Sequence, residues 1–563
     1  MNEFIFGSLA TLEKRVAHLQ EQVRGVRVSQ LTPPMPKPGE SPLLTVTAGL
    51  AEAVTAVHCH LLLPEQTTIS LEAGAVAWDL LNWRYYQLWQ GRLPAYPAGT
   101  LVRYQIEATT AHSQQKISAA NGTNFSYLVG PAKPPAWAAE AIIYQLFPDR
   151  FYPGDGRGWQ PAQSLNDIYG GTLHGVIDKL DYIADLGFNC LWLNPFFPDE
   201  THHGYHAADY FQVNARLGTL ETVRELVEQA HQRGIRVLLD FVANHWGSRH
   251  VTFTDAKKNP DSPYRSWYNW IHYPDVYESF FGVQDLPQIN TDNPAARAHL
   301  LEAARYWLTE FGFDGFRLDY ALGPSLDFWT EFRAEVKQAR PNAWIFGEAV
   351  DTPARQLEYQ GRLDGCLDFL LLQMLRDTFA FGSVKVTEFD AFLNQHEAFF
   401  PPDFSRPSFL DNHDMNRFLW LVKGDNRRLK LAALCQFTLA GPPIVYYGTE
   451  VGLSQERDIA WPDGRHIMEE SRLPMIWDET QQDQDLHAYY RWLIRLRREH
   501  PVLVNGRRQT LHADDNQATY AYGRQNEQET IVVAFNLSDS PQTITVPGHT
   551  FHLAAVTGDL IVI

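Results

Sequence analysis

The chain has 563 residues, of which 45% are hydrophobic and 20% charged, and it carries a formal net charge of −19. Nucleic acids and anionic membranes are bound by basic surfaces, so this charge argues against both as partners. The length exceeds what one hydrophobic core usually holds, so two to four domains are expected.

Four cysteines stand singly in apolar segments, and no CxxC pair occurs. This pattern favours buried free thiols and a reducing compartment over disulfides or zinc. No apolar stretch approaches the ~18 residues of a membrane span, and the first residues lack a signal-peptide pattern. We therefore expect a cytoplasmic protein.

The N-terminal part divides into two predicted units. Over residues 1–30, apolar side chains recur at spacings of four and three, which is typical of a helix that docks on a partner or on its own domain. The Pro-rich run 31–42 cannot continue a helix and is a predicted linker, so 1–42 is treated as one segment. Residues 43–137 contain short β-like runs separated by Gly, Pro and Asn, and they predict a β-sandwich.

Residues 138–500 alternate between strand-like and helix-like patterns. Eight strand–helix units predict an α/β fold with a parallel (β/α)8 TIM barrel. An aromatic-rich insertion of about 246–293 follows the third strand, and long insertions of this kind are usually functional. Residues 501–563 return to β-like runs and predict a C-terminal β-sandwich. The candidate barrel strands are 141–147, 190–197, 236–242, 314–320, 344–350, 366–371, 407–412 and 444–450.

Four apolar runs of this region end in acidic residues, namely Asp240, Asp319, Glu348 and Asp414. A carboxylate at the end of a buried strand is costly to desolvate. In a barrel of this type, the carboxyl ends of the strands form the active-site face. The four acids therefore predict one acidic pocket, which suits cleavage of a glycosidic bond by paired carboxyl groups.

The motifs DFVANH, GFRLD, GE and FLDNHD resemble, in order, the four short sequence regions of the α-amylase family, family 13 of the glycoside hydrolases. This resemblance covers roughly 138–500. The N-terminal sandwich and the phrase AIIYQLFPDRF further resemble the branch of cyclomaltodextrinases, neopullulanases and maltogenic amylases.

The resemblance implies a role for each acid. Asp319 matches the nucleophile, Glu348 the general acid/base, and Asp414 a third carboxylate that grips sugar hydroxyls. Arg317 lies two residues before Asp319 and is expected to lower its pKa and keep it ionised. An apolar setting would raise the pKa of Glu348, so that it carries a proton near neutrality.

Further positions match the family's sugar contacts and supports. His245, His413, Tyr205 and Asn244 match substrate-binding positions, whereas Asp240 and Asp209 match structural ones. The implied mechanism is a retaining double displacement, which needs the two catalytic carboxyls ~5–5.5 Å apart. The expected substrates are α-glucans.

Two alternatives stay open: a transglycosylase or sugar isomerase of the same family, and a non-catalytic glucan-binding protein. Three segments depart from the branch, YALG at 320–323, AVD at 349–351 and LPQIN at 286–290. The resemblance implies that all three lie at the acceptor side of the cleft. The choice among cyclodextrins, pullulan, starch and maltooligosaccharides therefore stays open.

No cofactor is required by this chemistry, and no metal ligand is predicted. The branch often binds a structural calcium in the loop after the first strand, but here the loop 150–161 holds a single acidic side chain, Asp155. Calcium prefers six to eight oxygen ligands, so calcium binding is weakly supported. The resemblance also suggests a homodimer that forms through the N-terminal domain.

Overall fold

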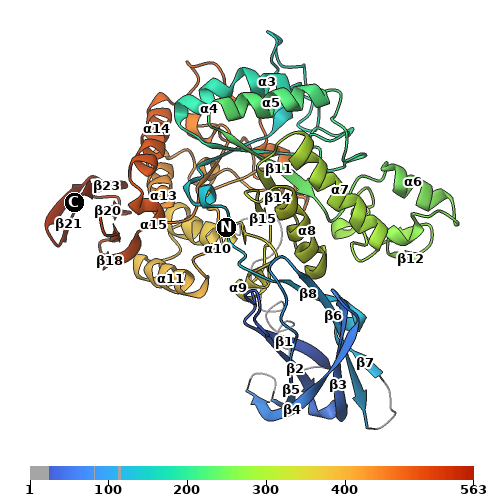
Figure 1. Ribbon diagram of the computed structural model, residues 1–563. Coiled ribbons are helices and arrows are strands. Elements are labelled where there is room, and N and C mark those ends of the chain that lie inside the picture. The colour runs from blue at the N-terminus through green and yellow to red at the C-terminus, as the bar shows by residue number, and fades with distance from the viewer. Residues whose placement is uncertain (1–24, 81–82, 112–115) are drawn as a thin grey trace.

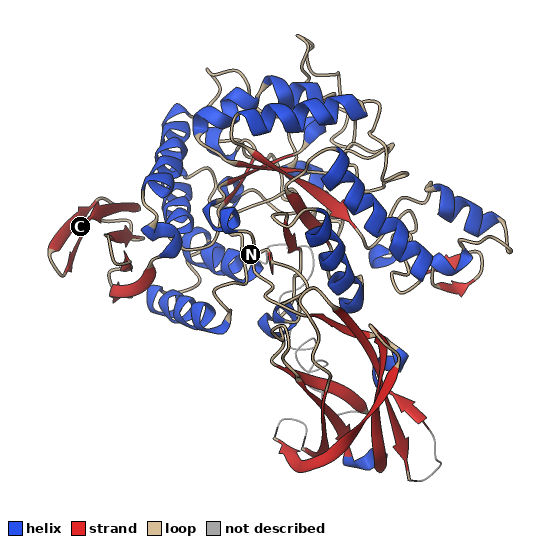
Figure 2. Cartoon of the chain, viewed as in Figure 1, coloured by secondary structure: helices blue, strands red, loops and turns tan. Residues whose placement is uncertain are grey.

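The computed structural model describes residues 25–80, 83–111 and 116–563. A central parallel sheet with surrounding helices forms the largest unit, an antiparallel sandwich lies below it, and a smaller antiparallel unit lies beside it (Figures 1 and 2). The (β/α)8 barrel with a flanking antiparallel unit at each end is therefore confirmed. No helix of the described part combines the length and apolar character needed to cross a membrane.

The N-terminal unit is an eight-stranded antiparallel arrangement in which one long strand joins both layers. The strand β4 pairs with β3 through its first residues and with β5 through its last residues. The strands are β1 (Val26–Thr32), β2 (Leu43–Gly49), β3 (Val54–Leu63), β4 (Thr67–Asp79), β5 (Arg84–Arg92), β6 (Leu101–Thr110), β7 (Lys116–Ser118) and β8 (Phe125–Leu128).

The predicted N-terminal helix lies almost wholly in residues 1–24, outside the described residues. Its last turn was wrongly assigned, because Val26–Thr32 forms β1 and pairs with β2. Gly25 precedes β1 with φ of 65°, a conformation that interrupts a helix and that glycine adopts without strain. The sandwich therefore begins before the Pro-rich run, which connects two of its own strands.

The barrel strands follow the order β16-β15-β14-β11-β10-β9-β17 and are all parallel. Buried Val, Ile, Leu, Phe and Trp fill these strands, as expected for a sheet covered on both faces. The strands are β9 (Ile143–Leu146), β10 (Cys190–Leu193), β11 (Arg236–Val242), β14 (Gly315–Asp319), β15 (Trp344–Gly347), β16 (Gly365–Cys366) and β17 (Ile444–Tyr446).

Helices surround this sheet (Figure 2). Side-chain caps begin several of them, as where Asn293 accepts hydrogen bonds from the first turn of α7. The helices are α2 (Pro148–Phe151), α3 (Leu173–Asp178), α4 (Leu180–Leu186), α5 (Leu220–Gln232), α7 (Pro294–Glu310), α8 (Leu326–Ala339), α9 (Pro353–Leu357), α10 (Phe369–Leu375), α11 (Val386–Phe399), α12 (Phe418–Leu421), α13 (Asn426–Thr438), α14 (Gln484–Glu499) and α15 (Val502–Asn505).

Two of the predicted barrel strands differ in the structure. The run 366–371 was predicted as a strand, but only Gly365–Cys366 is extended and Phe369 begins α10, which Asp368 caps by accepting from Leu371 N at 3.0 Å. Short apolar runs do not distinguish a buried strand from a buried helix.

The predicted seventh strand, 407–412, forms no regular ladder. Single bridges join Ser405 to Gly365 and Ser408 to Pro443, so segment 405–408 occupies the position between β16 and β17 and closes the barrel. Proline has no N–H to donate to a ladder, and both Pro407 and Pro443 lie at this seam.

The insertion after β11 has its own elements, α6 (Val251–Lys258), β12 (Trp270–His272) and β13 (Val276–Tyr277). The C-terminal unit packs a four-stranded sheet against a two-stranded one around a core that includes Val532, Ile544 and Phe551. Its strands are β18 (Arg507–Asp514), β19 (Thr519–Gln525), β20 (Thr530–Asn536), β21 (Gln542–Val546), β22 (His549–Leu553) and β23 (Thr557–Val562).

Candidate active site

A single arginine joins the acidic ends of three neighbouring strands. The strands β11, β14 and β15 are adjacent, and Asp240 lies directly opposite Arg317 in the ladder. Arg317 is fully buried; its Nη1 donates to Asp240 Oδ1 at 2.8 Å and to Asp319 Oδ1 at 2.8 Å. Its Nη2 lies 2.9 Å from Glu348 Oε2. Both predicted catalytic carboxyls are therefore held by one guanidinium.

A second chain of contacts leads from Asp240 to Asp414. The Tyr205 hydroxyl donates to Asp240 Oδ2 at 2.9 Å and lies 2.6 Å from His413 Nε2. The two rings stack with centroids 5.4 Å apart and planes 6° apart. His413 Nε2 is in turn 3.1 Å from Asp414 Oδ2. Asp240, Tyr205, His413 and Asp414 thus form one connected side of the site.

The protonation of the carboxyls follows from burial and from the number of cations. Burial raises the pKa of Glu348, as the resemblance implied; Arg317 opposes this shift. Burial also raises the pKa of Asp319 well above its usual range. Arg317 opposes this rise, but repulsion from Glu348, Asp240 and Asp414 adds to it. Arg317 thus lowers the pKa of Asp319 as expected, but burial and the neighbouring carboxyls outweigh its effect.

Asp414 behaves differently from these two. Burial alone would raise its pKa, but His413, Arg472 and Arg317 together lower it, so this carboxylate is ionised. Burial lowers the pKa of His413 to about 3, and the imidazole is neutral near pH 7. The cluster thus contains one firmly ionised acid and others that compete for a proton.

Charge counting supports the same conclusion. The four carboxyls Asp240, Asp319, Glu348 and Asp414 face the guanidiniums of Arg317 and Arg472. Like charges that share one buried site cannot all ionise, so the cluster retains at least one proton. A site with one protonated and one ionised carboxyl can act as general acid and nucleophile together.

The loop after β14 lies against Glu348 on the other side. Tyr320 N donates to Glu348 Oε2 at 3.1 Å, and Tyr320 has φ of 38°, which is uncommon for a residue with a side chain. Its ring contacts Phe280 at 4.9 Å and Phe281 at 5.3 Å between centroids. The departure at 320–323 therefore adds an aromatic wall from the insertion beside the acid/base.

His245 and Asn244 lie behind this wall. The His245 ring is buried 4.6 Å from the Phe280 ring, and its Nδ1 is 3.1 Å from Asn244 Nδ2. Gly323 approaches Asn244 so closely that a Cβ at this glycine would lie 1.8 Å from Asn244 Oδ1. This contact gives Asn244 a positioning role for the loop 320–323, whereas sugar contacts of His245 and Asn244 stay predictions.

Asp209 lies apart from the carboxyl cluster. Its Oδ1 accepts from Phe211 N at 2.7 Å, which closes a local turn. The neighbouring Tyr210 is fully buried and donates to Val242 O at 2.6 Å, at the end of β11. Asp209 therefore closes a turn in the segment that follows Tyr205, and its supporting role stays a prediction.

Several residues of the site carried no sequence signal that singled them out. Arg472 Nη2 donates to Asp414 Oδ1 at 2.8 Å, and its Nε donates to His413 O at 2.8 Å. Trp192 Nε1 donates to Asp240 Oδ2 at 3.0 Å, and Gln145 Nε2 lies 2.9 Å from His413 Nδ1. Trp192 and Gln145 lie in predicted barrel strands, so an inspection of those strands could have found them. Arg472 lies in a long loop after β17, where no such pattern exists.

Calcium binding stays a prediction. In the described part of the chain, no group of three or more His, Cys, Asp or Glu side chains could hold a metal ion. The carboxylate of Asp155 is engaged by Arg157 at 2.9 Å, and both side chains are more than half exposed. All four cysteines are free and buried.

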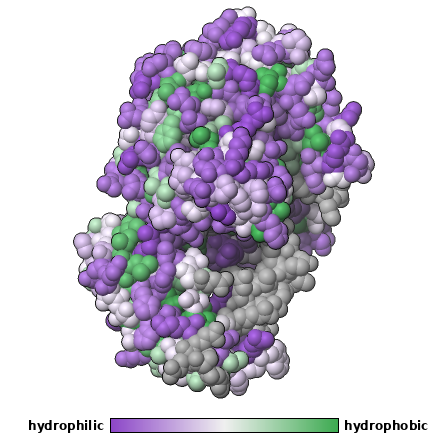
Figure 3. All heavy atoms as spheres, turned by 90° about the vertical axis from the view of Figure 1, so that its right-hand side faces the viewer, coloured by the Kyte–Doolittle hydropathy of each residue, from purple (hydrophilic) through white to green (hydrophobic). Residues whose placement is uncertain are grey.

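The face that carries the insertion is hollowed near its centre, and the visible floor of the hollow is hydrophilic (Figure 3). The carboxyl end of β11 points toward this side (Figure 1), and β14 and β15 run parallel to it. A barrel with paired acids at these strand ends is the architecture of a glycoside hydrolase.

The comparison with family models agrees with this class. The model for the alpha-amylase catalytic domain matches residues 145–506, and the chain belongs to the alpha-amylase family. It is similar to Alpha-amylase 2 of Dictyoglomus thermophilum, 34% identical over 97% of this chain and 94% of that protein. It is 39% identical to a cyclomaltodextrinase of Bacillus sp over 73% of this chain and 75% of that protein.

A solved structure of a cyclomaltodextrinase superposes with a TM-score of 0.70 at 31% identity and covers 93% of both chains. This coverage includes the flanking antiparallel units as well as the barrel. The chain is therefore an enzyme of the glycoside hydrolase class, similar to the cyclomaltodextrinase and neopullulanase branch.

Proposed function

We propose that this enzyme hydrolyses α-glucosidic bonds of maltooligosaccharides, cyclodextrins or related α-glucans by a retaining double displacement. The observation that carries the proposal is the shared hold of Arg317 on Asp319 and Glu348, at 2.8 Å and 2.9 Å. Two carboxyls held by one guanidinium suit the ~5–5.5 Å separation of retaining enzymes better than the ~6.5–9.5 Å of inverting ones.

In the first step, Glu348 gives its proton to the glycosidic oxygen while Asp319 attacks the anomeric carbon. The raised pKa of Glu348 keeps this proton available. The bond from Arg317 to Asp319 Oδ1 orients the attacking carboxylate. In the second step, Glu348 accepts a proton from water, and the hydroxide oxygen displaces Asp319 from the sugar.

Asp414 and His413 would hold the sugar before the cleaved bond. Asp414 is ionised and fixed by Arg472, and neutral His413 is stacked on Tyr205, so this side presents an acceptor and a rigid aromatic pair. These groups suit hydroxyl recognition and stabilisation of a cationic sugar ring.

Proton NMR of the first products from β-cyclodextrin and maltotriose tests the mechanism. Retention predicts that the α-anomer accumulates first. Trapping with a fluorinated glucosyl fluoride, followed by peptide mass spectrometry, should label the peptide that contains Asp319. First release of the β-anomer, or a label on another carboxyl, would contradict the assignment.

A second function, transglycosylation, is favoured by the aromatic wall of Tyr320, Phe280 and Phe281. Phe281 is 59% exposed, and sugar faces stack well on exposed aromatic rings. Such a wall would place a sugar hydroxyl, rather than water, beside Glu348 in the second step. Products longer than maltotriose from maltotriose alone would reveal this activity, and their absence at high substrate concentration would reject it.

A homodimer through the N-terminal unit is a further proposal. The tip of the β4–β5 hairpin exposes Trp83 and Leu80 to 77% each and Tyr85 to 56%. Contiguous exposed apolar side chains of this kind mark interaction surfaces. Sedimentation of the whole chain should show a dimer that a Trp83→Ser, Tyr85→Ser double variant loses; a monomeric parent chain would reject the proposal.

A further inference from the structure

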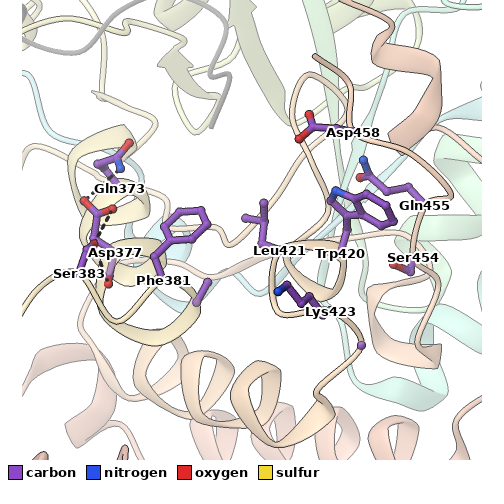
Figure 4. A pocket seen from close by; sticks show the side chains of 12 residues that line it. Gln373, Asp377, Phe381, Ser383, Trp420, Leu421, Lys423, Ser454, Gln455 and Asp458 are labelled. Carbon is purple, nitrogen blue, oxygen red and sulfur yellow. Dashed lines mark hydrogen bonds between the residues drawn. The ribbon is translucent and has the colours of Figure 1, made fainter. Parts of the chain in front are cut away.

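A large cavity lies next to the segment that follows Asp414 in the chain, and it plays no part in the mechanism above. Its volume is about 1,210 Å³, which exceeds the range of about 300–1,000 Å³ usual for drug-sized ligands. Three segments line it: the end of α10 with the π-helix η6 (Arg376–Ala380), α12 with the turn after it, and the loop after β17 (Figure 4).

These segments follow the last three positions of the barrel. The helix α10 follows β16, α12 follows the closing segment 405–408, and the loop 452–458 follows β17. The cavity therefore opens among the loops at the carboxyl ends of the strands, on the same face as Asp414. A ligand in the cavity and a sugar at Asp414 would bind to the same side of the barrel.

Asn416 connects the cavity wall to the loop that carries Asp414. Asn416 Nδ2 donates to Asp458 Oδ1 at 3.1 Å, and Gln455 Nε2 donates to Asn416 Oδ1 at 2.6 Å. Arg417 N donates to Gln455 Oε1 at 2.7 Å. Two lining residues, Gln455 and Asp458, are thus hydrogen-bonded to residues 416 and 417, which follow Asp414.

The chemistry of the lining fits a neutral polyhydroxylated ligand. Phe381 and Trp420 project into the cavity from opposite walls, with Leu421 between them (Figure 4). The carboxylates of Asp377 and Asp458 outnumber the one lysine, Lys423, so phosphate-bearing and other anionic ligands are disfavoured. Aromatic faces combined with carboxylate and amide groups are the contacts that a sugar needs.

The carboxylate of Asp377 is held in place before any ligand arrives. Gln373 Nε2 donates to Asp377 Oδ2 at 3.0 Å, and Ser383 Oγ donates to Asp377 Oδ1 at 3.5 Å. Asp377 lies on the π-helix, an irregularity that occurs frequently at functional sites. Preorganised acceptors of this kind lower the entropic cost of binding.

We propose that this cavity is a second oligosaccharide-binding site, which holds an α-glucan segment between Trp420 and Phe381. This inference rests on the proposed function, because the glucan that binds here is the substrate of the neighbouring site. Glucans long enough to reach both sites gain affinity from the cavity, whereas short ones bind only at the carboxyls.

The test compares Trp420→Ala and Phe381→Ala with the parent enzyme on maltoheptaose and on maltotriose. Loss of one aromatic contact should raise KM for maltoheptaose at least about fivefold and leave maltotriose within about twofold. Trp420→Phe keeps an aromatic face and should restore most of the affinity. The half-buried Trp492 of α14 lies outside the lining, so Trp492→Ala is the matched control.

Calorimetry separates this inference from the proposed function. The Glu348→Gln chain should bind maltoheptaose at least about fivefold more tightly than the same chain with Trp420→Ala, whereas both chains should bind maltotriose within about twofold of each other. Equal affinity of the two chains for maltoheptaose, or an equal KM increase for both substrates in Trp420→Ala, would overturn the cavity site. If the parent enzyme hydrolyses neither glucan, the proposed function fails, and the difference in maltoheptaose affinity then decides the cavity site by itself.

Discussion

The two ends of β14 carry one aspartate each, and their surroundings differ in charge. At the amino end, Asp314 accepts from His231, Arg340 and Arg236 at 2.7, 2.8 and 3.2 Å. At the carboxyl end, Asp319 shares Arg317 with Asp240 and Glu348. Burial alone would raise the pKa of Asp314, but His231 and the other partners lower it, whereas the pKa of Asp319 is raised.

The difference lies in the ratio of cations to carboxylates. Asp314 has several cationic partners to itself, as has Asp364 beside β16, which Arg333 and Lys337 contact at 2.7 and 2.8 Å. Such an acid stabilises the folded barrel. An acid that shares one cation with two other acids has a perturbed pKa, and perturbed pKa values are typical of catalytic sites. Stability and catalysis are thus separated along one strand, as they are between the two faces of barrels of this kind.

Substitution at the carboxyl end should cause the largest change in rate. Glu348→Gln should lower kcat about 10²–10⁴-fold, the usual contribution of general acid–base catalysis, and Asp319→Asn should lower it at least as much. Both changes remove a repelled buried carboxylate, so the melting temperature should stay constant or rise. Hydrolysis of maltotriose and thermal unfolding are the measurements; a collapse of stability in either variant would contradict the comparison.

The matched substitution at the amino end, Asp314→Asn, should lower stability and leave the catalytic rate nearly unchanged. Asp314→Asn leaves Arg236 and Arg340 without their carboxylate, and breaking a buried pair costs about 3–5 kcal/mol. We expect Asp314→Asn to lower the free energy of unfolding by a smaller amount, about 2 kcal/mol, because both arginines are partly exposed. The melting temperature should fall, while kcat of the folded enzyme stays within about twofold. A large loss of kcat without a loss of stability would refute the division between the two ends.

The pH dependence of these two effects should have opposite signs. Raised pKa values mean that the folded chain holds protons that the unfolded chain releases above about pH 4, so stability at the carboxyl end falls as pH rises. The gain from Asp319→Asn should therefore grow between pH 4 and 7. The lowered pKa of Asp314 contributes stability that is present above about pH 4 and is lost as pH falls, so the cost of Asp314→Asn should shrink in acid. Denaturant unfolding of the variants and the parent chain at several pH values measures both trends.

The sequence predicted the acids at strand ends because a buried apolar run followed by a carboxylate is visible locally. It could not predict the direction of the pKa shift at Asp319. Arg317 is two residues away in sequence, but the number of carboxyls that share it depends on contacts among β11, β14 and β15. Arg472 was missed for the same reason, since its contact with Asp414 spans 58 residues.

The fold shows the same limit. Strands with long apolar runs, such as Arg236–Val242, were predicted closely, whereas the closing seam of the barrel was not. Pro407 interrupts that seam, and Asp368 diverts the apolar run after it into α10 by capping the helix. The cavity near Trp420 combines three segments that are far apart in the chain, so no local pattern indicates it.

The smallest effect is expected one residue beyond Asp319. Tyr320→Asn removes the ring but keeps the backbone N–H that Glu348 accepts, and asparagine tolerates the positive φ at this position. Because the ring contacts Phe280 and Phe281, its loss opens the acceptor side to water. The rate of maltotriose hydrolysis should change less than about threefold, a difference below about 1 kcal/mol, while the ratio of transfer products to hydrolysis products falls. Tyr320→Phe keeps the ring and should leave the ratio unchanged, as chromatography of the products can show. An unchanged ratio in Tyr320→Asn would mean that the aromatic wall has no part in choosing the acceptor, and the chemistry of this strand end would stop at Asp319.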